Sequence, residues 1–333
     1  MSKPPLSLSY HNFNRGFSPA DDFFARAFGE DFDVRIVQAG ADLQISSVFG
    51  SEPLPAPGGG RRALRIWYSG EARDPQWQIF DLYFAFRSSS PLFGKRWHRL
   101  PLWVQYIDWW NPASPFHVSK LLDRPEGGAR PRFCNFIYSA PAATRAEFLL
   151  RLNAVRPVDS YGKVLNNQSG RQPPGRDGKL QVLRQSTFTV AFENYIAPGY
   201  VTEKILEPMF AGSIPVYWGA AEAKSDFNPD AFIFAEDFGT FDELAAHLVR
   251  VADSPDELAA LRRAPVFAGN AIPYERRPEY FVDRIKEALS GSADAIVPRA
   301  MIEQPFDPAA EKKLKRRLRI LRDRLRRRHL PRA

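Results

Sequence analysis

The strongest constraint on the fold of this chain is the segment 189–220, which reads TVAFENYIAPGYVTEKILEPMFAGSIPVYWGA. It begins in an apolar run that predicts a buried strand at 188–192 and ends in a second such run at 214–218. A loop with Pro198-Gly199 and a helix predicted at 202–211 lie between them. Because a helix between two buried strands is the unit of a parallel sheet, the segment predicts an α/β fold.

The rest of the chain shows the same alternation of short apolar runs and stretches with helical spacing. A helix at 21–28 is expected to begin after Ser18-Pro19, a cap followed by a first-turn proline. We predict further strands at 6–10, 34–38, 43–48, 64–68, 80–86, 133–139 and 232–234, and further helices at 142–153, 241–251 and 255–264.

The length of 333 residues suggests two domains, each large enough to bury its own core. The segment 155–162 looks like the crossing between two halves. We therefore predict domains at 1–155 and 156–297, followed by a linker and tail at 298–333. The single cysteine fits a reducing compartment, and no apolar run is long enough for a signal peptide. We expect a cytoplasmic protein, or one on the cytosolic face of a membrane.

Polar residues gather at the predicted ends of the strands in the segment 189–220. Glu193 and Asn194 end one strand, and Thr202, Glu203 and Lys204 begin the next helix. Ligands of open α/β sheets bind outside the carboxyl ends of strands, near helix N-termini. A diphosphate there would receive backbone N–H groups, the helix dipole and the Lys204 ammonium. The alternative is a solvated first turn beside a loop cap. The residues alone indicate only an anion or nucleotide site.

Several ordered blocks of this sequence resemble the bacterial family-10 α-1,3/4-fucosyltransferases. The clearest is FEN followed by YVTEK and AGSIPVYWG, within the segment 189–220. The likeness covers roughly residues 5–285 and includes SSVFGSE (46–52), IWYSGEARDPQWQIFDLYFAF (66–86), RLPLW (99–103), FCNFIYS (133–139), VDSYGKVLNN (158–167) and AKSDFNPDAFIFAEDF (223–238).

This resemblance implies the GT-B architecture, in which two Rossmann-like domains face each other across a cleft. The C-terminal domain would bind GDP-fucose, and the N-terminal domain would receive the acceptor. The implied reaction inverts the anomeric centre in one displacement. Such a reaction needs a carboxylate to take the proton of the incoming hydroxyl and positive groups to stabilise the departing diphosphate. No cofactor or metal is implied beyond the donor substrate.

Matching the blocks residue by residue assigns the reaction to particular side chains. The base is Glu71 of the sequence YSGE, although a surface pair between Glu71 and Arg73 is the structural alternative. Leaving-group stabilisation falls to Lys204, with help from Lys163, a position at which some relatives carry arginine.

The same match assigns donor binding to Asn194, Tyr200 and Glu203, with Glu203 on the ribose. Within the base-bearing block, Asp81 and Arg73 are possible supports, and Asp81 is expected to be structural. Ala72 stands where the family commonly has asparagine. A hydrogen bond that orients the base or the acceptor is therefore expected to be missing, which leaves the acceptor preference open.

Two further patterns have competing interpretations. Asp31-Phe32-Asp33 is a D-x-D sequence of the kind with which GT-A enzymes hold Mn²⁺, but the surrounding blocks contradict that fold. The five histidines show no ligand spacing, so no metal site is predicted. The aromatic run at 103–110 suits either a sugar-stacking groove or core packing, and core packing is at least as good an interpretation.

The segment 309–333 is strongly basic. It holds twelve Lys or Arg and two acidic residues, a charge of +10, which leaves about −2 of the net +8 for the rest of the chain. Leucines from Leu314 to Leu325 recur at helical spacing. A basic amphipathic helix on the anionic inner face of the membrane is the favoured interpretation. A coiled-coil homodimer and a solvated tail are the alternatives. Nucleic-acid binding would rest on this tail alone, so it is not expected.

We therefore expect an inverting fucosyltransferase that moves L-fucose from GDP-fucose to a hydroxyl of GlcNAc or a related sugar, with an α-1,3 linkage. The acceptor would be an oligosaccharide or a glycolipid, as in the biosynthesis of lipopolysaccharide or of protein-linked glycans. One alternative is a GT-B transferase that uses another GDP-sugar. The other is a catalytically silent module that binds a glycan or a nucleotide.

Overall fold

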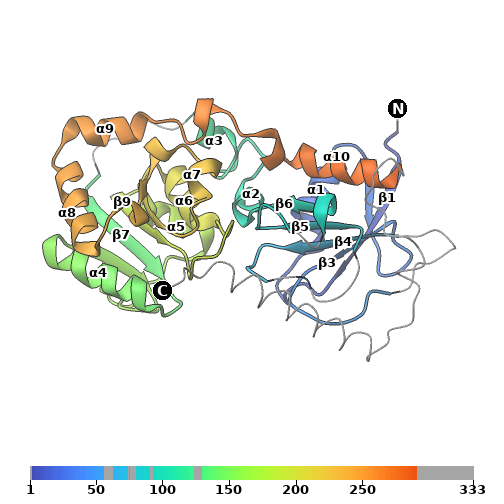
Figure 1. Cartoon of the computed structure of the whole chain (residues 1–333), viewed down its shortest axis with the longest axis horizontal. Helices are drawn as coiled ribbons and strands as arrows, with labels where there is room; N and C mark the ends of the chain where they lie inside the picture. The colour runs from blue at the N-terminus through green and yellow to red at the C-terminus, as the bar shows by residue number, and fades with distance from the viewer. Residues whose placement is uncertain are drawn as a thin grey trace, which may run out of the picture.

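The computed structural model describes residues 2–55, 63–73, 75, 80–90, 93–123 and 130–290. Within these residues the chain forms two α/β lobes that lie side by side along the long axis of the molecule (Figure 1). The predicted α/β class is therefore confirmed. The predicted linker and basic helix at 298–333 lie outside the described residues. None of the helices in the described ranges is long and apolar enough to cross a bilayer.

The first lobe is built on a parallel sheet with the strand order β2-β1-β3-β4-β5-β6. All of its predicted strands are confirmed, and β6 is an addition. The central strands are buried along their whole length, as parallel strands covered on both faces must be. The strands are β1 (Pro5–His11), β2 (Asp33–Ile36), β3 (Leu43–Ser46), β4 (Leu64–Ser69), β5 (Leu82–Ala85) and β6 (Trp97–Arg99).

Helix α1 (Phe23–Gly29) covers one face of this sheet through Phe24 and Phe28. The expected cap at Ser18 is wrong for this helix. Ser18 precedes a short 3₁₀ turn (Pro19–Asp21), and the carboxylate of Asp22 caps α1 by accepting a 2.9 Å hydrogen bond from the Phe24 amide. A carboxylate at this position stabilises both the free amides and the positive end of the helix dipole.

The second lobe is built on a parallel sheet with the strand order β11-β10-β9-β7-β8. Helices α4 (Ala143–Val155) and α8 (Phe241–Ala252) pack on one face, and α5 (Gly175–Leu183) and α6 (Glu203–Ala211) pack on the other. Small helices α7 (Ala223–Asp226) and α9 (Pro255–Arg263) complete this lobe. Its strands are β7 (Arg132–Tyr138), β8 (Val158–Gly162), β9 (Ser186–Phe192), β10 (Ile214–Trp218) and β11 (Ile233–Phe234).

The structure corrects the predicted boundary between residues 155 and 156. Strand β7 lies inside the second sheet, between β8 and β9, so the second lobe begins before residue 132. The boundary was misplaced because the sequence of β7 is mostly apolar, and such a sequence predicts a buried strand without indicating which sheet the strand belongs to. Helices α2 (Leu102–Tyr106) and α3 (Ser119–Leu122) lie between the two lobes (Figure 1).

The last described helix, α10 (Pro278–Leu289), returns to the first lobe although it follows the second in the sequence (Figure 1). Its Phe281 ring lies 5.8 Å from the ring of Phe23 and 5.3 Å from that of Phe84. Its Lys286 ammonium lies 2.6 Å from the Asp31 carboxylate. The predicted domain 156–297 therefore contains a helix that packs with the first lobe.

A buried carboxylate joins the two lobes. Asp226, at the end of α7, accepts hydrogen bonds from both terminal nitrogens of Arg99 at the end of β6, one of them at 2.7 Å. The indole of Trp103 donates to the same carboxylate at 3.1 Å, and the Arg276 guanidinium lies 3.3 Å away. Arg99 also donates to the Gly199 carbonyl of the second lobe at 3.1 Å. These contacts fix how the lobes face each other.

The aromatic run at 103–110 serves mainly as core. Trp103 is fully buried, and its ring lies 4.9 Å from Phe227 and 5.9 Å from Phe267 of the second lobe. Trp110 lies partly buried under the guanidinium of Arg26 at 4.8 Å. Apolar contacts of this kind continue from one lobe into the other, so one hydrophobic cluster extends through both lobes, beside a separate cluster within each.

We predict that Asp226→Asn destabilises the protein by about 3–5 kcal/mol, because it leaves the Arg99 guanidinium buried without its counter-charge. Thermal and urea unfolding of the two proteins measures the difference. Asp230→Asn is the matched control, since that aspartate is exposed four residues away, and it should change the free energy of unfolding by less than about 0.5 kcal/mol. Equal effects of the two substitutions would contradict the assigned role of Asp226.

Candidate functional site

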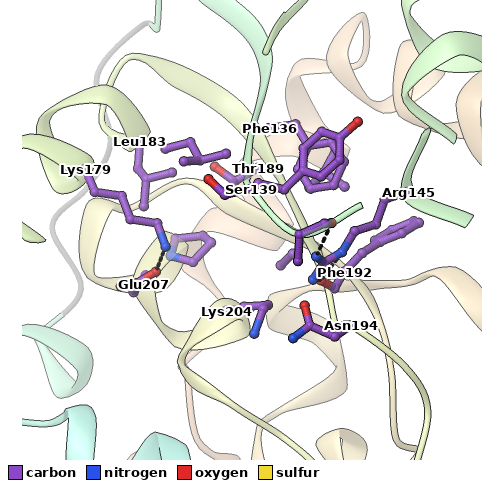
Figure 2. A pocket seen from close by; sticks show the side chains of 16 residues that line it. Phe136, Ser139, Arg145, Lys179, Leu183, Thr189, Phe192, Asn194, Lys204 and Glu207 are labelled. Atoms are coloured by element: carbon purple, nitrogen blue, oxygen red, sulfur yellow. Dashed lines mark hydrogen bonds and ion pairs between the residues drawn. The ribbon is translucent and has the colours of Figure 1, made fainter. Parts of the chain in front are cut away.

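A pocket of about 200 Å³ lies at the carboxyl ends of β7 and β9 (Figure 2). These neighbouring strands mark the point where the chain order of the second sheet reverses, since β8 lies to one side of β7 and β9 to the other. Loops that leave such neighbours in opposite directions open a crevice for ligands. Helices α4, α5 and α6 supply the remaining walls.

Two cations and an amide face this pocket from different elements. Figure 2 shows Asn194 after β9, Lys204 at the start of α6 and Arg145 from α4 on the same side of the pocket. Asn194 is exposed, and the Lys204 side chain is 22% exposed, so both are within reach of a ligand. On the other side, Lys179 of α5 pairs with Glu207 of α6. The cations give the pocket the character of an anion site.

Arg145 is the residue of this pocket that the sequence interpretation missed. It is only 2% exposed, and its guanidinium donates to the Phe192 carbonyl at the end of β9. The signal was present in the sequence, because Arg145, Phe148, Leu149 and Leu152 follow one another at helical spacing on the buried face of α4. An arginine within an apolar helix face must be satisfied by other groups, and here those groups lie at the pocket.

The start of α6 has the predicted capping. Thr202 is the N-cap, and its hydroxyl faces the Lys204 amide at 3.4 Å and the Lys204 ammonium at 3.0 Å. Glu193 was predicted at the end of the strand before this helix, without a role for its carboxylate, which is buried. It accepts hydrogen bonds from the Thr202 amide at 2.8 Å and the Thr202 hydroxyl at 2.9 Å, and it lies 3.1 Å from the Lys204 ammonium. Glu193 therefore holds both the helix start and the lysine.

The charges of this cluster are set by competition between burial and neighbours. Burial alone lowers the pKa of Lys204, but the negative charges of Glu193 and Glu203 outweigh burial and raise it. Burial would raise the pKa of Glu203, but Lys204 and Lys179 lower it. Lys204 is therefore a cation and Glu203 an anion at neutral pH. Burial raises the pKa of Glu193, and Lys204 offsets that effect only in part.

The predicted base, Glu71, lies in the first lobe. It follows β4 directly, and the Ser69 hydroxyl fixes the turn by donating to the Glu71 carbonyl at 2.6 Å. Within the described part of the chain, no hydrogen bond or ion pair reaches its half-buried carboxylate. Burial raises the pKa of Tyr200 in the second lobe, and the charges of Glu71 and Glu193 raise it further. The predicted base in one lobe and Glu193 beside the predicted donor site in the other therefore both raise the pKa of the same tyrosine.

Tyr200 itself is buried at the contact between the lobes. Its ring lies 5.9 Å from Phe86 of the first lobe, nearly perpendicular to it, and stacks on Tyr195 at 5.0 Å. Gly199 beside it has a φ of +78°, and a Cβ there would meet the Phe86 carbonyl at 2.4 Å. Only glycine fits at this approach between the lobes.

Three other predicted residues lie elsewhere. Lys163 is exposed after β8 and is not among the residues that line the pocket, although its amide donates to the carbonyl of the pocket residue Tyr138 at 3.2 Å. Arg73 donates to the Val48 carbonyl at 3.3 Å instead of pairing with Glu71. Asp81 is buried at the amino end of β5 and accepts a 2.8 Å hydrogen bond from the Arg65 amide. Since Arg65 begins β4 and Glu71 follows its end, Asp81 does not orient Glu71.

The D-x-D sequence lies far from the pocket, at the edge strand of the first sheet. Asp31 pairs with Lys286, and Asp33 at the start of β2 pairs with Arg35 at 2.9 Å. In the ranges that the structure describes, His, Cys, Asp and Glu side chains form no group of three or more that is arranged to hold a metal ion. The groups that face the pocket can bind a polyanion by hydrogen bonds and by side-chain charge.

Comparison with known families finds two matching sequence profiles. The profile "Alpha-(1,3)-fucosyltransferase FucT N-terminal domain" matches residues 8–106, and "Glycosyltransferase family 10 (fucosyltransferase) C-term" matches residues 132–260. The two matches end and begin where the structure passes from the first lobe to the second.

Curated relatives are similar over part of their length. The α-(1,3)-fucosyltransferase FucT of Helicobacter pylori is 30% identical over 211 residues, which is 55% of this chain and 43% of that protein. α-(1,3)-Fucosyltransferase B of Drosophila melanogaster is 32% identical over 57% of this chain and 46% of its own length. Human GDP-fucose protein O-fucosyltransferase 3 is 28% identical over 66% of this chain and 46% of its own. The chain thus spans less than half the length of these relatives.

Solved structures share the fold of both lobes together. An α1,3-fucosyltransferase solved with GDP-fucose superposes with a TM-score of 0.68 and 23% identity, covering 89% of this chain and 93% of that one. Anabaena HepE in complex with UDP-glucose superposes with a TM-score of 0.52 and 12% identity, covering 86% and 100%. This similarity extends across the contact between the lobes.

We predict that Lys204→Ala lowers the affinity for GDP, the nucleotide that the sequence resemblance indicates, by roughly tenfold or more. Arg145→Lys should weaken binding by a similar factor, because lysine keeps the charge but loses the planar fork. Lys163→Ala is the matched control, since it removes an exposed lysine outside the pocket, and it should change the affinity by less than about twofold. Titration calorimetry checks all three. An effect of Lys163→Ala as large as that of Lys204→Ala would contradict this pocket as the nucleotide site.

Proposed function

This chain belongs to glycosyltransferase family 10, and on that premise we propose that it transfers L-fucose from GDP-fucose to a hydroxyl of a glycan, with an α-1,3 linkage. The GT-B fold supports this proposal. The observation that carries it is electrostatic: the charges of Glu71 from one lobe and of Glu193 from the other both raise the pKa of Tyr200, and Glu193 and Glu203 both pair with Lys204.

In the proposed reaction Glu71 is the general base. Its carboxylate takes the proton of the acceptor hydroxyl while the acceptor oxygen forms a bond to C1 of fucose. The bond between C1 and the phosphate oxygen breaks in the same displacement, so the configuration at C1 inverts and GDP leaves with the bonding electrons. A carboxylate that has no ion-pair partner among the described residues suits this role, because within that part of the chain it can accept a proton without breaking an existing ion pair.

The negative charge that develops on the departing diphosphate needs fixed positive groups. Lys204, Arg145 and the N-terminus of α6 face the pocket and supply them. Because protein groups provide this charge, the proposed reaction includes no metal and no cofactor other than the donor. In this proposal Glu203, held as an anion at the first turn of α6, accepts the ribose hydroxyls.

We predict that Glu71→Gln lowers the rate of fucose transfer by about 10²–10⁴-fold, the contribution of a positioned base, while the affinity for GDP stays within about twofold. Transfer is measured with a GlcNAc-terminated acceptor, and GDP binding by calorimetry. Glu30→Gln in the same lobe is the control, because that carboxylate is exposed at the end of α1, and it should leave both quantities unchanged. Undiminished turnover by Glu71→Gln would overturn the assignment of the base.

The hexose and the acceptor are tested with substrate panels. GDP release is compared for GDP-fucose, GDP-mannose and UDP-sugars, and release from GDP-mannose alone would favour a transferase of another GDP-sugar. Release from none of them, with GDP still bound, would favour a silent binding module. Because one relative is a protein O-fucosyltransferase, the acceptor panel includes Ser/Thr peptides beside glycans that end in GlcNAc.

We further propose that the protein works at the cytoplasmic face of the membrane, on a lipid-linked or lipopolysaccharide glycan. The support is the basic segment 309–333 with its leucines at helical spacing. Attraction to an anionic surface by a cluster of Lys and Arg falls with rising salt, because it is electrostatic.

Removal of residues 309–333 should abolish sedimentation with vesicles that contain anionic phosphatidylglycerol and leave fucose transfer to a soluble acceptor intact. Binding of the full chain should weaken as salt rises, and vesicles of neutral phosphatidylcholine are the control. Equal binding to vesicles by the full and shortened chains would overturn the membrane role. A change in oligomeric state on truncation would favour the dimer, and binding of RNA or DNA lost with the tail would favour a nucleic-acid role.

A further inference from the structure

Two exposed aromatic side chains, one from each lobe, follow the carboxyl ends of strands as Glu71 does. Tyr195 follows the pocket residue Asn194 after β9 and is 43% exposed. Phe49 follows β3 in the first lobe and is 46% exposed. Large apolar side chains that stay in water beside a reactive carboxylate suggest a surface that a ligand covers.

Tyr195 is fixed in place on one face only. Its ring stacks on Tyr200 at 5.0 Å with an angle of 4° between the planes, so Tyr200 covers one face and the exposed surface belongs to the other face and the edge. The Ala72 amide, next to Glu71, faces the Tyr195 hydroxyl and lowers its pKa. Burial raises the pKa of Tyr195, and the charge of Glu71 raises it further. The ring therefore lies within the electrostatic field of Glu71.

Phe49 lies close to Arg73, whose charge also affects Tyr195. The guanidinium carbon of Arg73 lies 6.0 Å from the centre of the Phe49 ring, and its positive charge also lowers the pKa of Tyr195. The Phe49 amide donates to the Asn12 carbonyl at 2.8 Å, which places Phe49 between the ends of β1 and β3. The strand order of the first sheet reverses there, as that of the second sheet reverses at β7 and β9.

We propose that Phe49 and Tyr195 bind the acceptor sugar by stacking on the apolar faces of its pyranose ring, and thereby place one of its hydroxyls at Glu71. The inference rests on the proposed function and adds the acceptor subsite to it. The ligand class is a hexopyranose with a continuous face of axial C–H groups. Such a face is apolar while the ring edge carries hydroxyls, so it fits a pair of aromatic rings beside a carboxylate.

The geometry also explains how a site without the family's asparagine after the base can orient its acceptor. Ala72 has no polar side chain, but its backbone amide faces the Tyr195 hydroxyl. The position of the Tyr195 ring near the base thus depends on contact between the two lobes. A loop of the donor lobe would in this way contribute to acceptor binding.

The test compares Tyr195→Ala, Tyr195→Phe and Phe49→Ala, with Tyr274→Ala as the matched control. Tyr274 is also 43% exposed, but it lies in a turn next to α10 and its hydroxyl bonds to Asp283. Tyr195→Ala and Phe49→Ala should raise the acceptor KM by about tenfold, with the donor KM within about twofold. Tyr195→Phe keeps the ring and should stay within about twofold of the parent chain, as should Tyr274→Ala.

A Tyr195→Phe variant as impaired as Tyr195→Ala would overturn the proposal, because the hydroxyl and its hydrogen bonds would then be what matters. Equal rises in donor and acceptor KM would also overturn it. Saturation-transfer NMR of a GlcNAc-terminated trisaccharide on the GDP-bound full chain gives a readout without turnover. Binding that Tyr195→Ala abolishes, in a chain that transfers no fucose, would support the acceptor subsite and reject the transferase. Absence of binding to the parent chain would reject the subsite.

Discussion

The arrangement of this molecule depends on the carboxylate of Asp226, which lies between the lobes out of contact with water. A buried carboxylate must be neutralised and hydrogen-bonded, and Asp226 takes its partners from three separate parts of the chain: Arg99, Trp103 and Arg276. Arg99 in turn holds the Gly199 carbonyl. Because such a network is satisfied only in one geometry, it fixes the relative position of the lobes. That position lets the charge of Glu71 in one lobe raise the pKa of Tyr200 in the other.

The same physical rule operates at the pocket. Glu193 is as deeply buried as Asp226, and it is satisfied by Thr202 and Lys204 at the start of α6. Its role is to hold a cation and a helix N-terminus so that both face the pocket. Lys204 remains a cation because two carboxylates outweigh its burial. In the proposed reaction, a pre-arranged positive group of this kind stabilises the leaving diphosphate without reorganising first.

Several features of the site follow from the sequence, and the exceptions have identifiable causes. Thr202 as N-cap and Glu71 at the end of β4 were predictable, because capping and strand ends depend on a few neighbouring residues. Lys163 and Arg145 show the limit of that approach. Both belong to the second lobe, but the register of β7 and β8 leaves Lys163 outside the pocket and the packing of α4 turns Arg145 toward it.

The amino-acid sequence by itself determined the alternation of strands and helices, the family resemblance and the candidate base, since periodicity, turns and motifs are local. Tertiary structure decided that β7 joins the second sheet, that α10 returns to the first lobe and that Tyr200 packs against Phe86. These outcomes join residues far apart in the chain; Arg99 and Asp226 are separated by 127 positions. Such contacts form because a buried charge needs an opposite charge or a hydrogen-bond partner, and an apolar face needs another apolar surface. These partners lie far away in the chain, so no local sequence pattern identifies them.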